Sequence, residues 1–129
     1  MNKDKFQKLL DLHFINEEMF KGKDIDNLLD KRDDAIFDSL WVHAYKEINQ
    51  VAKEYTIDSE TKKQIDNLRE QSFKKTFHLT SNSDVSACVS DDMGLIATSY
   101  LIDYENLWLK RMIELYELNI FPCGELDRL

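Results

Sequence analysis

The pattern of apolar and polar residues predicts a series of amphipathic helices. It is clearest over residues 35–56, where apolar side chains recur at helical spacing and so fall on one face. That face is formed by Phe37, Leu40, Trp41, Ala44, Ile48, Val51, Ala52 and Tyr55. The same spacing predicts a helix over residues 4–20. It also predicts a peripheral helix with a thinner apolar face, from Asp58 or Ser59 to about Leu79.

Residues 83–102 fit two interpretations. Their apolar side chains can form one face of a single helix, but the polar run Ser90-Asp91-Asp92 interrupts the pattern. The two interpretations fit the pattern equally well. For Asp91 and Asp92 themselves we favour exposed first-turn positions of a capped helix, where carboxylates are stabilising. In a single helix, Asp92 would instead project onto the apolar side together with Ser99 and would mark a functional pocket.

The densest apolar stretch, residues 100–121, predicts the last helix. Asp103 is suited to cap it, with Glu105 in its first turn, and Asn119 is suited to end it. Apolar residues cover most of its circumference, namely Leu107, Trp108, Leu109, Met112, Ile113, Leu115, Tyr116 and Leu118. A helix of this kind lies at the centre of a core or forms half of an interface. We therefore expect it to be the centre of the bundle and the border of a binding face.

Glycine and proline are scarce in this chain, which favours long helices over a fold with many tight turns. The 129 residues include only 3 glycines and 1 proline, and turns depend on these two residue types. Gly22 is suited to end the first helix, Asp24 to cap a short second one, and Asp33 or Asp34 to cap the next. We predict an all-α fold, with residues 1–129 forming a single-domain bundle of five or six helices.

Charge limits the classes of partner. The net charge is −8, and residues 81–129 hold 9 acidic but only 3 basic residues. A protein this acidic repels phosphate backbones, so we expect no nucleic-acid partner and favour a basic protein. We expect a cytoplasmic protein with reduced cysteines. The reasons are that its first residues lack a secretory signal and that no stretch approaches the roughly 18 apolar residues of a membrane span.

The acidic C-terminal third therefore carries the predicted binding surface. Its carboxylates would surround aromatic anchors of the kind enriched at interface centres. The predicted partner-binding residues are Asp84, Asp91, Asp92, Asp103, Tyr104, Glu105 and Trp108. Small acidic helical proteins that shield basic toxins or nucleases, the immunity-type inhibitors of bacteria, use the same physics. This analogy rests on composition and size, without a shared motif, and it makes a non-catalytic binding module our main hypothesis.

Two alternatives remain open. His13 with Glu17 and His43 with Glu47 have the four-residue spacing that places both ligands of a pair on one helix face. Two such helices facing each other could bind a metal ion, with His78 as a fifth ligand, in a helical metalloprotein or metal-dependent hydrolase. No nucleophile motif or glycine-rich phosphate loop supports another enzyme class, and we expect no cofactor. The second alternative is a homodimer through the apolar last helix.

Overall fold

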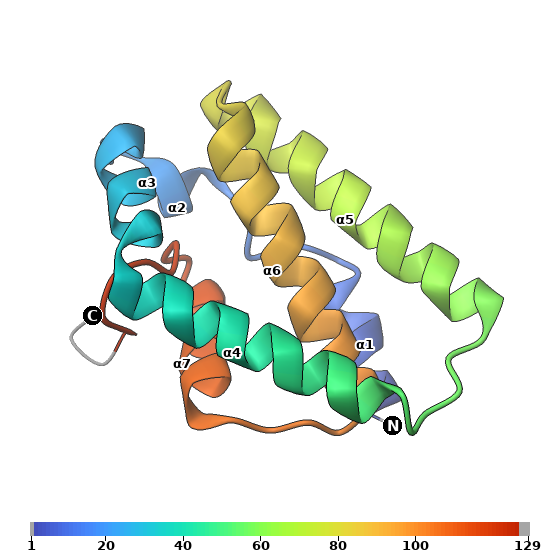
Figure 1. Ribbon diagram of the computed structural model, residues 1–129. Coiled ribbons are helices and arrows are strands. Elements are labelled where there is room, and N and C mark those ends of the chain that lie inside the picture. Colours follow the sequence, from blue (N-terminus) through green and yellow to red (C-terminus); the bar gives the residue numbers. More distant parts are fainter. Residues whose placement is uncertain (1, 127–129) are drawn as a thin grey trace.

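The computed structural model describes residues 2–126, and these residues fold into seven helices without a strand (Figure 1). The helices are α1 (Lys3–Leu9), α2 (Glu17–Phe20), α3 (Ile25–Asp33), α4 (Ala35–Ala52), α5 (Ser59–Thr80), α6 (Ser83–Leu101) and α7 (Leu107–Glu117). The predicted all-α bundle is confirmed. The number of helices exceeds the expected five or six because the first predicted helix is divided into α1 and α2.

The division between α1 and α2 follows from where the apolar side chains lie. Leu12, Phe14 and Ile15 are all buried, although they cannot share one face of a continuous helix with Phe6 and Leu9. The chain leaves the helix after α1 and reaches a left-handed conformation at Leu12, with a φ of 52°. The irregular segment thereby turns all three side chains into the core.

α6 is the centre of the fold. It is one uninterrupted helix, which decides between the two interpretations and excludes a break near Ser90. Eleven of its 19 residues are buried on several sides of the helix. In Figure 1, α6 lies between α5 and the group formed by α3, α4 and α7. The prediction that the last helix would occupy the centre is therefore wrong as well, because α7 buries one face, formed by Leu109, Met112, Leu115 and Tyr116.

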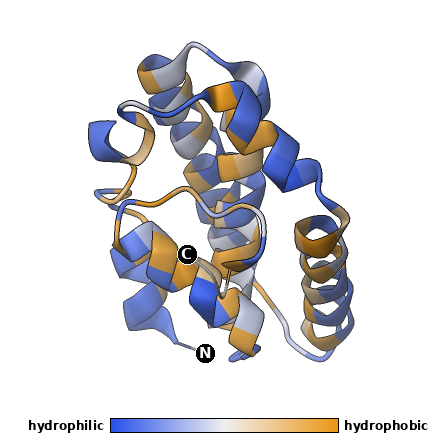
Figure 2. Cartoon of the chain, turned by 90° about the vertical axis from the view of Figure 1, so that its left-hand side faces the viewer, coloured by the Kyte–Doolittle hydropathy of each residue, from blue (hydrophilic) through white to orange (hydrophobic). Residues whose placement is uncertain are grey.

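α5 is a peripheral helix, as predicted. It runs antiparallel to α6 along most of its length (Figure 1) and buries only Leu68, Ser72 and Thr76. The small polar residues Ser72 and Thr76 let the two helices approach closely. The hydropathy colours in Figure 2 show hydrophobic and hydrophilic positions interleaved along the long helices, as expected for helices that each bury one side.

Helix ends follow local capping rules, with one exception. The side chains of Asp24, Asp34 and Asp58 accept hydrogen bonds from backbone N–H groups in the first turns of α3, α4 and α5, as predicted. The predicted cap at Asp103 is wrong. Asn106 caps α7 instead, and its side chain accepts a hydrogen bond of 2.8 Å from the backbone N–H of Leu109.

Candidate partner-binding groove

A buried ion pair connects the helices that carry the candidate site. Arg32 of α3 donates two hydrogen bonds to Asp92 of α6, of 2.7 and 2.8 Å. The Trp41 indole and the Tyr116 hydroxyl donate further bonds of 2.9 and 2.5 Å to the same carboxylate. Arg32 also donates to the backbone oxygen of Pro122 at 3.3 Å. This network joins α3, α4, α6, α7 and the segment after α7 around one carboxylate.

The surroundings of Arg32 keep its guanidinium charged. Its guanidinium lies 4.3 Å from the ring centroid of Phe37 and 5.2 Å from that of Phe121. Burial alone would lower the pKa of Arg32, but the charge of Asp92 and its hydrogen bonds raise it above its usual value. Burial first, and then Asp92, also raise the pKa of the Tyr116 phenol. Tyr116 is therefore a neutral donor to the carboxylate.

Asp92 is 0% exposed, so it cannot contribute to a partner-binding surface. Its assignment as a partner-binding residue is corrected, and so is its interpretation as an exposed first-turn residue. The alternative pocket with Ser99 is not formed either. The Ser99 hydroxyl donates to the backbone oxygen of Ile96 at 2.6 Å, and Ser99 lines a groove that Asp92 does not reach.

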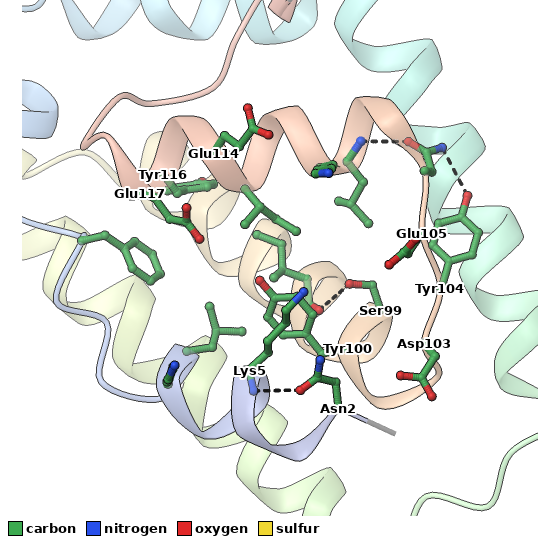
Figure 3. Close-up of a pocket in the computed structure, with 18 of the residues that line it drawn as sticks. Asn2, Lys5, Ser99, Tyr100, Asp103, Tyr104, Glu105, Glu114, Tyr116 and Glu117 are labelled. Atoms are coloured by element: carbon green, nitrogen blue, oxygen red, sulfur yellow. Dashed lines mark hydrogen bonds between the residues drawn. The ribbon is translucent and has the colours of Figure 1, made fainter.

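That groove has a volume of about 940 Å³. Figure 3 shows α1 on one side, α7 on the other, and the C-terminal part of α6 between them. The segment between α6 and α7 closes one end. Apolar side chains form much of the lining: Leu9, Phe14, Ile96, Leu107, Leu109 and Ile113. A concave, largely apolar site with polar edges is the usual form of a binding site.

Opposite charges line the two sides of the groove. The α1 side carries Lys5 and Lys8, both exposed. The α7 side carries Glu114 and Glu117, with one base, Lys110. Between the two sides, the Lys5 ammonium lies 5.7 Å from the ring centroid of Tyr100. Burial, and then the charge of Glu117, raise the pKa of Tyr100 to about 12.

The segment that closes the groove is held in place by hydrogen bonds. Asp103 has a left-handed backbone with a φ of 52°. The Tyr104 hydroxyl donates to Glu47 of α4, and the Asn106 side chain donates to that hydroxyl at 3.2 Å. Partial burial and then the bond to Glu47 raise the pKa of Tyr104. Asp103, Tyr104 and Glu105 are thereby presented together at the groove.

The other predicted partner-binding residues lie elsewhere. Asp84 stands in the first turn of α6, and the 19-residue length of the helix puts it roughly 28 Å from Asp103. Asp91 is exposed and accepts a bond of 2.8 Å from Arg69 of α5. Trp108 packs edge-on against Phe37 at 5.1 Å between ring centroids. The structure therefore brings together three of the seven predicted residues.

The two predicted metal-binding pairs are separate. His13 lies in the irregular segment before α2, so it does not share a helix face with Glu17. His43 and Glu47 do share a face, with 3.4 Å between Nε2 and Oε1, and both are exposed. Within residues 2–126, no three His, Cys, Asp or Glu residues are grouped so as to hold a metal ion. The premise that two facing helices supply four ligands is wrong.

Sequence reasoning missed the α1 side of the groove and the position of Leu107. Lys5 and Lys8 are one helical turn apart, a spacing that predicts a shared face, but nothing local indicates that this face meets α7. The sequence placed Leu107 on the apolar circumference of the last helix, without deciding between core and interface. It is 87% exposed as the first residue of α7 and lines the groove. Its place at a capped helix start, rather than its hydrophobicity, sets this exposure.

Comparison with known proteins identifies the family. Among the described residues, no helix is both long and apolar enough to cross a membrane. No curated protein matches the chain. A sequence profile described as Immunity protein PIM1 matches residues 6–123, which include most of both sides of the groove and the whole buried network. Because the match covers most of the chain, the protein belongs to the PIM1 family of immunity proteins.

Proposed function

We propose that this protein protects its cell by binding a toxin protein directly, in the cytoplasm, and blocking the toxin without any catalysis of its own. The family match carries this proposal, because an immunity protein acts on a protein partner. The structure supports a binding module: its concave site has an apolar lining with charged edges and contains no group of metal-ligating residues within residues 2–126.

We propose that the toxin is basic and that its first contact is with the end of the groove formed by Asp103, Tyr104 and Glu105. The net charge of −8 attracts a basic partner over a distance and speeds encounter. Tyr104 offers an aromatic contact whose orientation is fixed by Glu47 and Asn106. An aromatic residue fixed before binding loses little entropy on complex formation, which favours affinity.

The test uses the gene that neighbours this one. We expect it to encode a toxin whose expression arrests growth, and co-expression of this protein to restore growth. The purified toxin, with its activity disabled by mutation, should bind this protein in calorimetry with an affinity that falls as salt is raised. A neighbouring product that is harmless, or one that does not bind this protein, would contradict the proposal.

Exposed leucines at both ends of α7 favour a second candidate, a homodimer through this helix. Leu107 is 87% and Leu118 61% exposed, and neither contributes to the core. Light scattering decides between the two states: a particle of twice 15.3 kDa indicates a dimer. If Leu118→Ser returns such a dimer to a monomer without loss of toxin binding, α7 serves both contacts through different residues.

A further inference from the structure

We propose that the groove between α1 and α7 receives an amphipathic helix of the toxin, a helix that carries basic residues along one edge and acidic residues along the other. This inference rests on the proposed function and adds to it the form and the charge pattern of the bound segment. A partner recognised by negative charge alone would need only the acidic side. The observations below give both sides a role.

The first observation is the separation of charge across the groove. Lys5 and Lys8 project from α1, one turn apart, so they form a basic edge. On the opposite side, Glu117 of α7 and Glu105 of the closing segment form an acidic edge, which also carries one base, Lys110. A bound segment that lies between the two sides is exposed to positive charge on one side and negative charge on the other. If the segment carries both signs of charge, only one orientation of it is electrostatically favourable.

The second observation concerns the backbone of the bound segment. An extended segment gains affinity when it adds to the edge of an exposed sheet. The part of the chain that the structure describes has no strand, and helices wall the groove on both sides. A bound extended segment would leave its backbone groups without partners in an apolar site, at a cost. A helix satisfies its own backbone and can present a continuous apolar face to Leu107 and Ile113, which line the groove.

The third observation is size. A volume of about 940 Å³ holds roughly two turns of a helix that is ~10 Å across. Two turns carry enough side chains for one apolar face and two charged edges. At the closed end, the 87% exposed Leu107 offers a further apolar contact beside Glu105.

The test reverses the charge of each edge separately and measures affinity for the inactivated toxin encoded beside this gene. We expect Lys5→Glu with Lys8→Glu to weaken binding about tenfold or more, because an acidic edge of the toxin helix would then face carboxylates. Glu105→Lys with Glu117→Lys should weaken it similarly. Neither Glu105 nor Glu117 belongs to the buried network, so this second variant should unfold at the wild-type temperature.

Matched controls carry the same change of net charge on α5. They are Lys62→Glu with Lys63→Glu, and Glu60→Lys with Asp66→Lys, at exposed positions that do not line the groove. We expect these controls to change affinity less than about threefold. If a reversed variant fails to fold, Lys5→Gln with Lys8→Gln replaces it, with a smaller expected loss in the same direction.

The variant with Lys5→Glu and Lys8→Glu distinguishes a toxin that binds both charged edges from one that binds negative charge alone. Added negative charge would strengthen binding of a toxin that is simply basic, so tighter or unchanged binding overturns the two-edged groove while the immunity function stands. A wild-type protein that binds no toxin overturns both proposals. Hydrogen exchange in the complex should protect residues 3–9 and 107–117 and a helical segment of the toxin. Protection of an extended toxin segment would contradict the inference.

Discussion

Asp92 accepts hydrogen bonds from Arg32, Trp41 and Tyr116 inside the core. A buried carboxylate is costly unless its charge is compensated and its oxygens are hydrogen-bonded. Here one bidentate arginine and two neutral donors meet both needs. The adjacent residue, Asp91, forms its ion pair with Arg69 at the surface, where solvent screens the attraction. Neighbouring residues of the same type therefore differ widely in their effect on stability.

We predict that Asp92→Asn lowers the free energy of unfolding by about 3–5 kcal/mol, because it leaves Arg32 buried without a counter-charge. Asp91→Asn is the matched control and should cost less than about 1 kcal/mol. Urea denaturation followed by circular dichroism measures both changes. Similar decreases in the free energy of unfolding of the two variants would show that the buried ion pair stabilises the fold no more than the exposed one.

The sequence could point to Asp92 but not to its partner. Helical spacing places Asp92 on an apolar side, which predicts that something must compensate its charge. Arg32 stands 60 residues earlier, in a polar segment that reads as solvent-exposed. Only the packing of α3 against α6 brings the two together. The same reasoning explains why Asp92 was wrongly interpreted as an exposed first-turn residue, since capping is the commoner role of a local Ser-Asp-Asp run.

At the scale of elements, capping residues and periodicity allowed the helices to be predicted well. The approximate extents of α4 and α5 and the caps at Asp24, Asp34 and Asp58 followed from the sequence. The helix over residues 4–20 could not be predicted correctly, because a core that buries Leu12 and Phe14 overrides local helical preference. Which side of α1 faces the groove is likewise a tertiary property.

The start of α7 provides a test of capping. We predict that Asn106→Ala lowers the free energy of unfolding by about 1 kcal/mol, because the backbone N–H of Leu109 loses its acceptor. The variant also removes the donor to the Tyr104 hydroxyl. Asp103→Asn should cost less, since asparagine tolerates the left-handed backbone at that position. Thermal unfolding compares the two, and a larger loss at Asp103 would assign the capping role to that residue after all.

Two leucines near the start of α7 test how the helix is divided between core and surface. Leu107 is exposed, so Leu107→Ser should change stability by no more than about 0.5 kcal/mol. Leu109 is buried, and Leu109→Ala should cost about 2–5 kcal/mol. Toxin binding should show the opposite order among folded proteins, with the larger loss for Leu107→Ser. Equal destabilisation would mean that α7 is buried on all sides, as the sequence suggested.

For the whole molecule, raised pKa values predict lower stability in alkaline solution. Burial raises the pKa of Cys88 from 9.0 to about 11 and contributes most to raising that of Tyr100 from 10.0 to about 12. Between pH 9 and 12, the unfolded chain therefore releases these protons while the folded chain retains them. The free energy of unfolding must then fall as pH rises through this range.

Denaturation at several pH values between 8 and 12 measures this effect. Cys88→Ser combined with Tyr100→Phe removes both groups and should flatten the decline relative to the wild type. An unchanged slope would mean that other groups are responsible. Cys88 also lies near enough to Arg32 and Asp92 for their charges to act on it, so the single variants should be compared with the pair.

The fold class followed from composition and periodicity, whereas the groove could only be found in three dimensions. Scarce glycine and proline predicted helices, and the charge count located an acidic region that includes Asp103 and Glu105. The groove also needs Lys5 and Lys8, nearly a hundred residues earlier. A count of charged residues along the chain does not show on which face of the folded protein each charge lies. The count therefore suggested a site lined by acidic residues alone.

The bond from Arg32 to Pro122 has a consequence for the timing of protection. Ninety residues separate the two partners, and at about 5–20 residues per second a ribosome needs roughly 5–18 s to make the chain between them. Until Pro122 has been made, the Arg32 guanidinium lacks one of its hydrogen-bond acceptors. Until Asp92 has been made, it lacks its counter-charge. The buried network is therefore incomplete until residue 122 has been made. Under the proposed function, we expect a cell that makes the toxin to hold a reserve of folded immunity protein before the first toxin molecule appears.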